Sequence, residues 1–170
     1  MRRAILVCLG MAALPAYGQT PNCSDSRTIE LVKRIFGQAI ERRVAGMPQA
    51  KDVAAGIMSR SSVTVQSIRT VRIDEKIDKH FCQGVMELEL SPRSIATLGT
   101  PKGQALLAQG FDTRSVRIAG NKVAQDIRFT SQMIDDGNQH FAELGGFQGL
   151  AELAFRFTAP EVAEQLSPKR

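Results

Sequence analysis

The sequence predicts an α+β fold: a curved antiparallel sheet of about four to five strands, formed by two hairpins and packed on a long N-terminal helix, with a helical insert and a C-terminal helix. Three observations predict this class. Apolar residues recur at helical spacing over 24–43, apolar and polar residues alternate over 63–90, and Asp136-Gly137 separates two more alternating stretches. The two periods distinguish helix from strand, and Asp-Gly is favoured in type I′ hairpin turns.

The first helix is predicted over 24–43. The segment Ser-Asp-Ser at 24–26 offers N-cap residues, and Gly46 and Pro48 follow the last apolar position and end the helix. A shorter helix is expected over 49–59. The apolar face of the first helix is predicted to consist of Ile29, Val32, Ile35, Phe36, Ala39 and Ile40.

The alternating stretches 63–73 and 80–90 predict a long hairpin. Pairing Asp74 with Lys79 places opposite charges beside a four-residue loop and turns the apolar positions to one face. Further partners then follow: Ile73 with His80, Val71 with Cys82, Val65 with Leu88, and Val63 with Leu90.

The insert 91–112 is punctuated by glycine, proline and serine. Ser91-Pro92 and Thr100-Pro101 each place an N-cap residue before a proline, so two short helices are expected. A strand over 114–119 is then predicted to turn at Gly120-Asn121 into a strand over 122–134.

The second hairpin turns at Asp136-Gly137 and leads to a packed helix over 147–157. Residues 158–170 are predicted to form a C-terminal tail, in which 160–166 can add a turn or two of helix. The hairpin is expected to pair Met133 with His140, Ser131 with Ala142, and Phe129 with Leu144.

Residues 1–18 are predicted to be a cleavable signal peptide. Two arginines precede an apolar run over 4–14, and Ala16 and Gly18 are the small residues that a signal peptidase needs. The run is too short to span about 30 Å of hydrocarbon, so no integral membrane anchor is expected after processing. Lipidation at Cys8 is a weaker reading because the preceding Val7 is bulky.

The mature chain is therefore expected to start at Gln19 and to form one domain over 19–170 in the periplasm or outside the cell. It retains Cys23 and Cys82, which predict a disulfide in such an oxidising compartment. The alternative, a redox-active or metal-binding pair, lacks a CxxC spacing. Because Cys82 is predicted to face inward, the start of the first helix can bring Cys23 against it.

Composition limits the class of partner. The full chain has 170 residues and a net charge of +5, which falls to +3 without the signal arginines, and its basic residues are scattered. Aromatic residues make up 5% and tryptophan is missing from the sequence. Nucleic-acid binding, which uses basic and aromatic side chains together, is therefore not expected.

The stretches Ser67-Ile68-Arg69-Thr70, Phe81-Cys82 and Ile127-Arg128-Phe129-Thr130, the last leading to the Asp136-Gly137 turn, carry a resemblance. Their order of helix, hairpin, insert and hairpin resembles small exported domains of the cystatin-like or NTF2-like kind. The resemblance implies a curved sheet wrapped around one main helix. Members of these groups serve as inhibitors, as secretion or envelope components, and occasionally as enzymes, so it limits shape more than function.

Catalytic and metal-binding motifs were sought among the acids and histidines. His80 and His140 are candidate pocket residues, but both fall on apolar faces near hairpin ends, without the Glu or His spacing of a metal site. Glu87 and Glu89 lie about 7 Å apart on one strand face, which allows a glycosidase pair or an ordinary solvated face. The acids around Asp136 fit the turn better than a calcium loop. No catalytic residue, cofactor or metal is therefore predicted.

Arginines of the middle strands are the candidate partner-binding residues. If they share one sheet face they form a basic patch for an acidic partner; otherwise they line a solvated strand face. The patch is predicted to consist of Arg69, Arg72, Arg114, Arg117 and Arg128.

Three functions are compatible with these residues. The favoured hypothesis is a non-catalytic periplasmic binding or adaptor protein, such as an inhibitor, an immunity-type protein or an envelope or secretion-system component, whose partner is another periplasmic or envelope protein. A second is a small NTF2-like enzyme or ligand carrier with a pocket on the concave sheet face. A third is a structural envelope protein. No pattern in the sequence specifies an oligomeric state.

Overall fold

The computed structural model describes most of the chain. Within the described residues, an antiparallel sheet of six strands packs one face against helices, which confirms the predicted α+β class. The predicted signal peptide over 1–18, Arg114 and the Asp136-Gly137 turn lie outside the described part. The described ranges are 20–108, 115–134 and 139–167.

The helices follow the predicted order. The Asp25 carboxylate caps the first by accepting a hydrogen bond from the Arg27 N–H at 2.9 Å. Arg42 and Arg43 lie in its last turn, where they oppose the negative end of the helix dipole. The helices are α1 (Ser26–Val44), α2 (Ala50–Arg60), α3 (Pro92–Leu98), α4 (Pro101–Ala108), α5 (Gln148–Leu153) and α6 (Ala159–Leu166), with a π-helical turn over Ala154–Thr158.

The insert begins as predicted with two short helices. The Ser91 hydroxyl accepts from the Ser94 N–H at 3.1 Å and so caps α3. The Thr100 hydroxyl accepts from the Gly103 N–H at 3.0 Å at the start of α4. In both helices the proline takes the first helical position, where its missing N–H costs no hydrogen bond.

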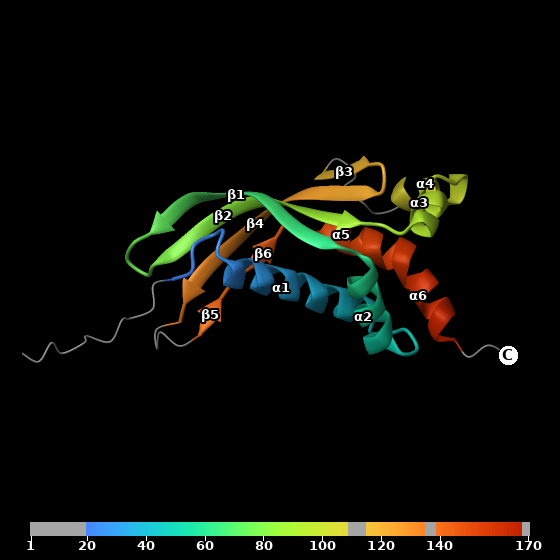
Figure 1. The fold of residues 1–170 in the computed structure, drawn as a ribbon, viewed down its shortest axis with the longest axis horizontal. Helices are drawn as coiled ribbons and strands as arrows, with labels where there is room; N and C mark the ends of the chain where they lie inside the picture. Colours follow the sequence, from blue (N-terminus) through green and yellow to red (C-terminus); the bar gives the residue numbers. More distant parts are fainter. Residues whose placement is uncertain (1–19, 109–114, 135–138, 168–170) are drawn as a thin grey trace, which may run out of the picture.

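The strands form one open sheet, in which β1, β2, β4 and β3 lie side by side in that order (Figure 1). Both β5 and β6 pair with β4 along the edge away from β2, the same edge that β3 uses further along the strand, so the single strand expected after the second turn is split in two. The strands are β1 (Val63–Asp74), β2 (Lys79–Glu89), β3 (Val116–Ala119), β4 (Lys122–Met133), β5 (His140–Phe141) and β6 (Leu144–Gly145).

The register of the first hairpin is correct only near its loop. Asp74 pairs with Lys79 and Ile73 with His80, as predicted. Two bulges in β1 then shift the pairing by two residues; one of them includes Ser67, whose φ is 53°. The corrected partners are Thr70 with Cys82, Val65 with Met86, and Val63 with Leu88.

The register of the second hairpin is confirmed. Met133 pairs with His140 in β5, and Phe129 pairs with Leu144 in β6. The third predicted pair, Ser131 with Ala142, falls in the gap that separates β5 from β6. The alternation of buried and accessible side chains along β4 therefore follows the pattern read from the sequence.

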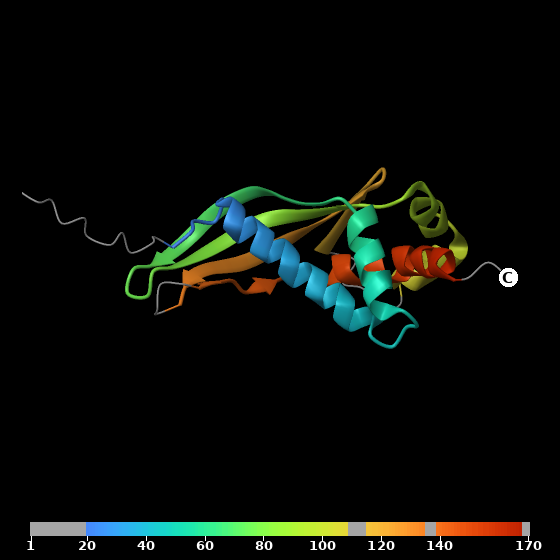
Figure 2. The same cartoon turned by 60° about the horizontal axis from the view of Figure 1, so that its bottom comes forward.

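The sheet curves around α1, which lies beneath it in Figure 1 and crosses in front of it in Figure 2. Val32, Phe36 and Ile40 of α1 are fully buried. The Phe36 ring meets the Phe147 ring in a T-shaped contact, with centroids 6.1 Å apart. The concave side of the sheet is therefore filled by core side chains.

A cysteine pair ties the start of α1 to the middle of β2. The sulfur atoms of Cys23 and Cys82 lie 2.09 Å apart, as the predicted disulfide requires, and both residues are buried. The Thr70 hydroxyl donates to the Cys23 sulfur at 3.2 Å. Helix and sheet are thus joined on the side that holds the core.

The predicted tail over 158–170 is helical as far as Leu166. Val162 of this last helix, α6, is buried and packs on Gly56 of α2, where a Cβ atom would come within 2.4 Å of Val162 Cγ1. The Arg60 guanidinium also pairs with Glu161 at 3.3 Å. Residues 159–166 therefore belong to the packed domain, because their apolar side has a partner in α2.

Candidate binding site on the outer face of the sheet

The face of the sheet opposite α1, called the outer face here, is made by alternate residues of the central strands. In β2, Gln83 and Val85 alternate with the buried Cys82 and Met86, as side chains of a strand must. No described helix lies over the middle of this face in Figure 1. Its members from β2 and β4 are Phe81, Gln83, Val85, Glu87, Ala124, Asp126, Arg128 and Thr130.

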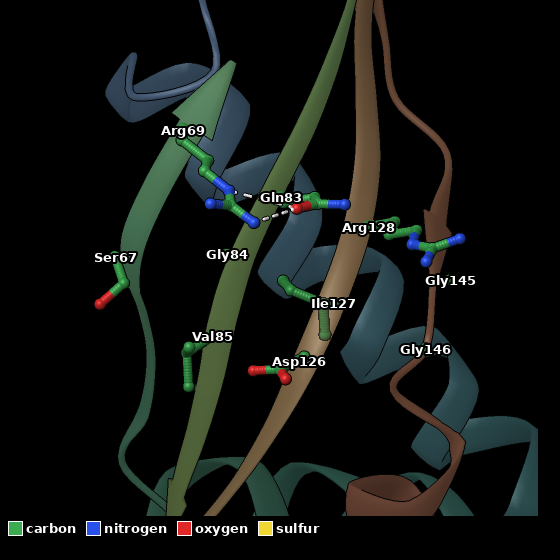
Figure 3. A pocket seen from close by; sticks show the side chains of 10 residues that line it. All are labelled: Ser67, Arg69, Gln83, Gly84, Val85, Asp126, Ile127, Arg128, Gly145 and Gly146. Atoms are coloured by element: carbon green, nitrogen blue, oxygen red, sulfur yellow. Dashed lines mark hydrogen bonds between the residues drawn. The ribbon is translucent and has the colours of Figure 1, made fainter. Parts of the chain in front are cut away.

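Two arginines flank a glutamine across three adjacent strands, an arrangement called the arginine row here. Arg69 of β1 pairs in register with Gln83 of β2, which pairs with Arg128 of β4. Two hydrogen bonds run from the Arg69 guanidinium to the Gln83 side-chain oxygen, at 2.7 and 3.2 Å (Figure 3). The long-range pairing of β2 with β4 is what brings these residues together.

The arginine row borders a hollow of about 670 Å³, called the polar hollow here. Gly145 and Gly146 bound it beside β4, and their missing side chains keep it open (Figure 3). Gly146 has a φ of +79°, and a Cβ atom there would lie 2.9 Å from the Asp126 carbonyl oxygen. Both the conformation and the close approach require glycine.

The polar hollow keeps an excess of positive charge although Asp126 lines it. Arg117 of β3 binds the Asp126 carboxylate at 2.8 and 3.2 Å, and this contact lowers the pKa of Asp126. No hydrogen bond or ion pair joins the exposed Arg128 side chain to another residue in the described part of the chain. Arg69 and Arg128 are therefore available to an anion.

A second hollow of about 540 Å³, called the apolar hollow here, adjoins the first. The Phe81 ring lies in it with the Arg72 guanidinium 4.1 Å from the ring centroid. Val71, which a bulge leaves 56% exposed, and Leu144 also line it. Apolar walls thus lie directly beside the arginine row.

The rim of the apolar hollow carries one acid, Glu143. Lys79 binds its carboxylate at 2.9 Å, and the Thr130 hydroxyl donates to the same oxygen at 3.1 Å. Both contacts lower the pKa of Glu143, with Lys79 the larger cause. Lys79 therefore offsets the charge of Glu143, while Arg72 leaves this end of the face with a positive charge of its own.

The structure brings three residues of the predicted arginine patch to the two hollows: Arg69, Arg72 and Arg128. Arg117 lies on the same face but is engaged by Asp126, and Arg114 falls outside the described residues. Several site residues were missed because they carry no charge or no side chain. They are Phe81, Gln83, Gly145 and Gly146, and the alternation around Cys82 is the signal that places the first two outward.

Both histidines lie near the hairpin ends, on the face of the sheet that also carries the buried Ser131. They line neither hollow. His80 Nε2 is 3.5 Å from Asp78, and its Nδ1 is buried without a hydrogen-bond partner among the described residues. His140 Nε2 lies 2.8 Å from the Ser131 hydroxyl, which is fully buried. These positions match the packed residues near hairpin ends that the sequence suggested.

The Ser131–His140 contact holds the N-terminal segment rather than a nucleophile. The Ser131 hydroxyl donates its one hydrogen to the Pro21 carbonyl oxygen at 2.5 Å, so His140 Nε2 donates to Ser131. The Thr20 N–H donates to Asp78 at 3.2 Å, and the Thr20 hydroxyl accepts from the Met133 N–H at 3.3 Å. A neutral His140 thus helps to fasten Thr20 and Pro21 to the sheet.

The stability of the domain is expected to fall as the pH drops from about 7.5 to about 5.5. Burial, with a smaller contribution from Arg27, lowers the pKa of His140 below its ordinary value of 6.5, while Asp25 opposes the shift. The unfolded chain then binds a proton that the folded chain does not, so stability declines as the pH falls through 6.5 towards the lowered value.

Urea unfolding across this range measures the effect. His140→Gln keeps a donor for Ser131 without titrating, and it should flatten the slope. An unchanged slope in that variant would assign the pH dependence to another group.

The two candidate acids on β2 are held by separate neighbours. Glu87 accepts from Lys122 at 2.7 Å, and Glu89 accepts from the Asn121 side chain at 2.6 Å. Both lie on the outer face as predicted. Each carboxylate, however, is bound to a different neighbouring residue.

No family model, curated protein or solved structure matches the chain. The described residues include no helix long and apolar enough to cross a bilayer. They also hold no group of three or more histidine, cysteine, aspartate or glutamate side chains placed to share a metal ion.

Proposed function

We propose that this chain is a non-catalytic binding protein of the periplasm or the extracellular space that attaches to an acidic surface of a partner protein. The observation that carries the proposal is the arginine row, Arg69–Gln83–Arg128, on the border of the polar hollow. Guanidinium groups bind carboxylates through paired, charge-assisted hydrogen bonds. The role is that of an inhibitor, an immunity-type protein or an adaptor in an envelope or secretion assembly.

Three further features support this proposal. The pattern over 1–18 predicts export, and the Cys23–Cys82 geometry suits an oxidising compartment. The concave side of the sheet is filled by α1, so the outer face is the surface of the sheet that a partner can reach. The cystatin-like or NTF2-like resemblance is also kept as a proposal, supported by the curvature of the sheet around one main helix.

Charge reversal in the arginine row is expected to abolish partner capture. Arg69→Glu with Arg128→Glu should lower the amount of cross-linked partner at least about tenfold, because like charges across an interface cost several kcal/mol. The measurement is cross-linking in the native periplasm with tagged mature protein, followed by quantitative mass spectrometry.

A matched control makes the same change of charge elsewhere. Arg34 of α1 and Lys51 of α2 are exposed and form no ion pair with another described residue. Arg34→Glu with Lys51→Glu should leave capture close to that of the wild type. If the row variant and the control retain the same partners equally, the outer face is not the docking surface and the proposal is wrong.

A further inference from the structure

The polar and apolar hollows form one groove along the strands. They share three lining residues, Gln83, Arg128 and Gly145, so they adjoin each other along β2 and β4. One end presents the arginine row and the other presents Phe81 and Val71. A ligand that fills both ends must carry a negative group beside an apolar one.

The polar end is built to accept a carboxylate. The Gln83 side-chain oxygen is occupied by Arg69, which leaves the amide nitrogen as a donor on the side of Arg128 (Figure 3). Arg69, Gln83 and Arg128 therefore carry donors of one kind along the row, with the Arg128 guanidinium turned towards Gly145 in Figure 3. Two guanidinium groups and an amide match the lone pairs of a carboxylate.

The apolar end differs from the polar end in offering apolar surface to a ligand. Arg72 covers the Phe81 ring and Glu143 lies on the rim, already bound to Lys79. An aliphatic or aromatic side chain placed here would bury Phe81 and Val71, whereas a carboxylate beside Glu143 would meet a like charge. Apolar surface directly beside the arginine row is thus what this end adds to the groove.

The spacing between the two ends is that of an extended chain. Phe81 and Gln83 are two residues apart on β2, as are Thr130 and Arg128 on β4, so the ends lie about 7 Å apart. Side chains at positions i and i+2 of an extended peptide lie on the same side at the same distance. A nucleic acid fits less well, because base stacking uses several exposed aromatic rings and Phe81 is the one accessible ring among the residues that line the two hollows.

We infer that the occupant of this groove is an extended protein segment with an acidic residue two positions from a large apolar residue. The acid lies in the arginine row and the apolar side chain lies against Phe81. This inference rests on the proposed function and adds the chemistry of the segment that docks. A single acid without the apolar neighbour is then a weak ligand.

Short peptides test the inference on the mature protein by two-dimensional NMR titration. The probe is acetyl-Thr-Glu-Thr-Phe-Thr-amide, with its reversed sequence as the second chain direction. At least one of the two should bind about tenfold more tightly than peptides with Gln for Glu, with Thr for Phe, or with Glu and Phe adjacent. Shifted resonances should include those of Gln83 and Phe81.

Two variants separate the ends of the groove. Arg128→Gln should remove the preference for Glu over Gln while keeping that for Phe over Thr, and Phe81→Ala should do the reverse. Arg34→Gln on α1 is the matched control and should change neither. Retention of both preferences in both variants would place the peptide elsewhere and overturn the inference.

The remaining outcomes distinguish this inference from the proposed function. The inference is overturned if the spaced and adjacent peptides bind equally, or if a five-nucleotide single strand binds more tightly than the peptides. In either case the proposed function still stands if charge reversal in the arginine row abolishes partner capture. If the wild-type protein does not distinguish the Glu peptides from the Gln peptides, the row does not bind acids and both fail.

Discussion

Replacing Phe36 with alanine is expected to lower the free energy of unfolding by about 3–5 kcal/mol. The side chain is fully buried on the concave side of the sheet, and its ring meets Phe147 in a T-shaped contact. The truncation removes apolar area from the core and leaves a cavity that neighbours from both helix and sheet can close only partly. Urea unfolding followed by circular dichroism measures the loss.

Phe141→Ala is the matched control for this prediction. Phe141 is 47% exposed in β5, so the same truncation should cost less than about 1 kcal/mol. A loss below about 1 kcal/mol for Phe36→Ala as well would contradict the packing of α1 described here.

Removing the Cys23–Cys82 bond is expected to destabilise the domain by about 4 kcal/mol. The two residues are 59 positions apart, so the bond closes a long loop and restricts the unfolded chain. Both cysteines are buried, and Cys23→Ala with Cys82→Ala therefore avoids burying new polar groups. Urea unfolding at neutral pH compares this variant with the oxidised wild type.

Reduction supplies the control for the cysteine variant. Dithiothreitol should lower the stability of the wild type towards that of the double variant and leave the variant itself unchanged. The wild-type protein used for this test must show no reactive thiol before unfolding, so that the disulfide is intact. If the reductant then leaves its stability unchanged, the disulfide does not contribute the stability expected of it.

The sequence predicted the elements of this fold because most of them are specified locally. Helix α1 follows from its apolar spacing and its Asp25 cap, and the second hairpin keeps its register because Phe129 and Met133 alternate regularly towards the turn. The C-terminal helix α6 was expected as a tail because the glycine that admits it, Gly56, lies about 100 residues away in the chain.

The register of the first hairpin shows what a period-two reading overlooks. Apolar residues of β1 are not evenly spaced: Ile68 comes three positions after Val65, and Val71 comes three positions after Ile68. Each gap coincides with one of the two bulges. An extra residue moves the next side chain to the other face, so the uneven spacing was the available signal.

The candidate site was predictable in part. The arginines on the strands were identified, but the row needs β2 beside β4, a pairing between two hairpins that no local pattern specifies. Gln83 had no feature to mark it until Arg69 and Arg128 were placed on either side. The sequence therefore identified the arginines of the site, while the order of the strands determined which of them lie together.

The bulges of β1 also affect whether this edge of the sheet can pair with a strand of a second copy. Within the described residues β1 pairs only with β2, so its outer border exposes unpaired backbone groups, the usual starting point for cross-strand aggregation. The irregular backbone at Ser67 and Val71 interrupts that border and offers no long, straight template to an incoming strand. The edge of β1 is thereby a poor partner for the same edge of a second copy.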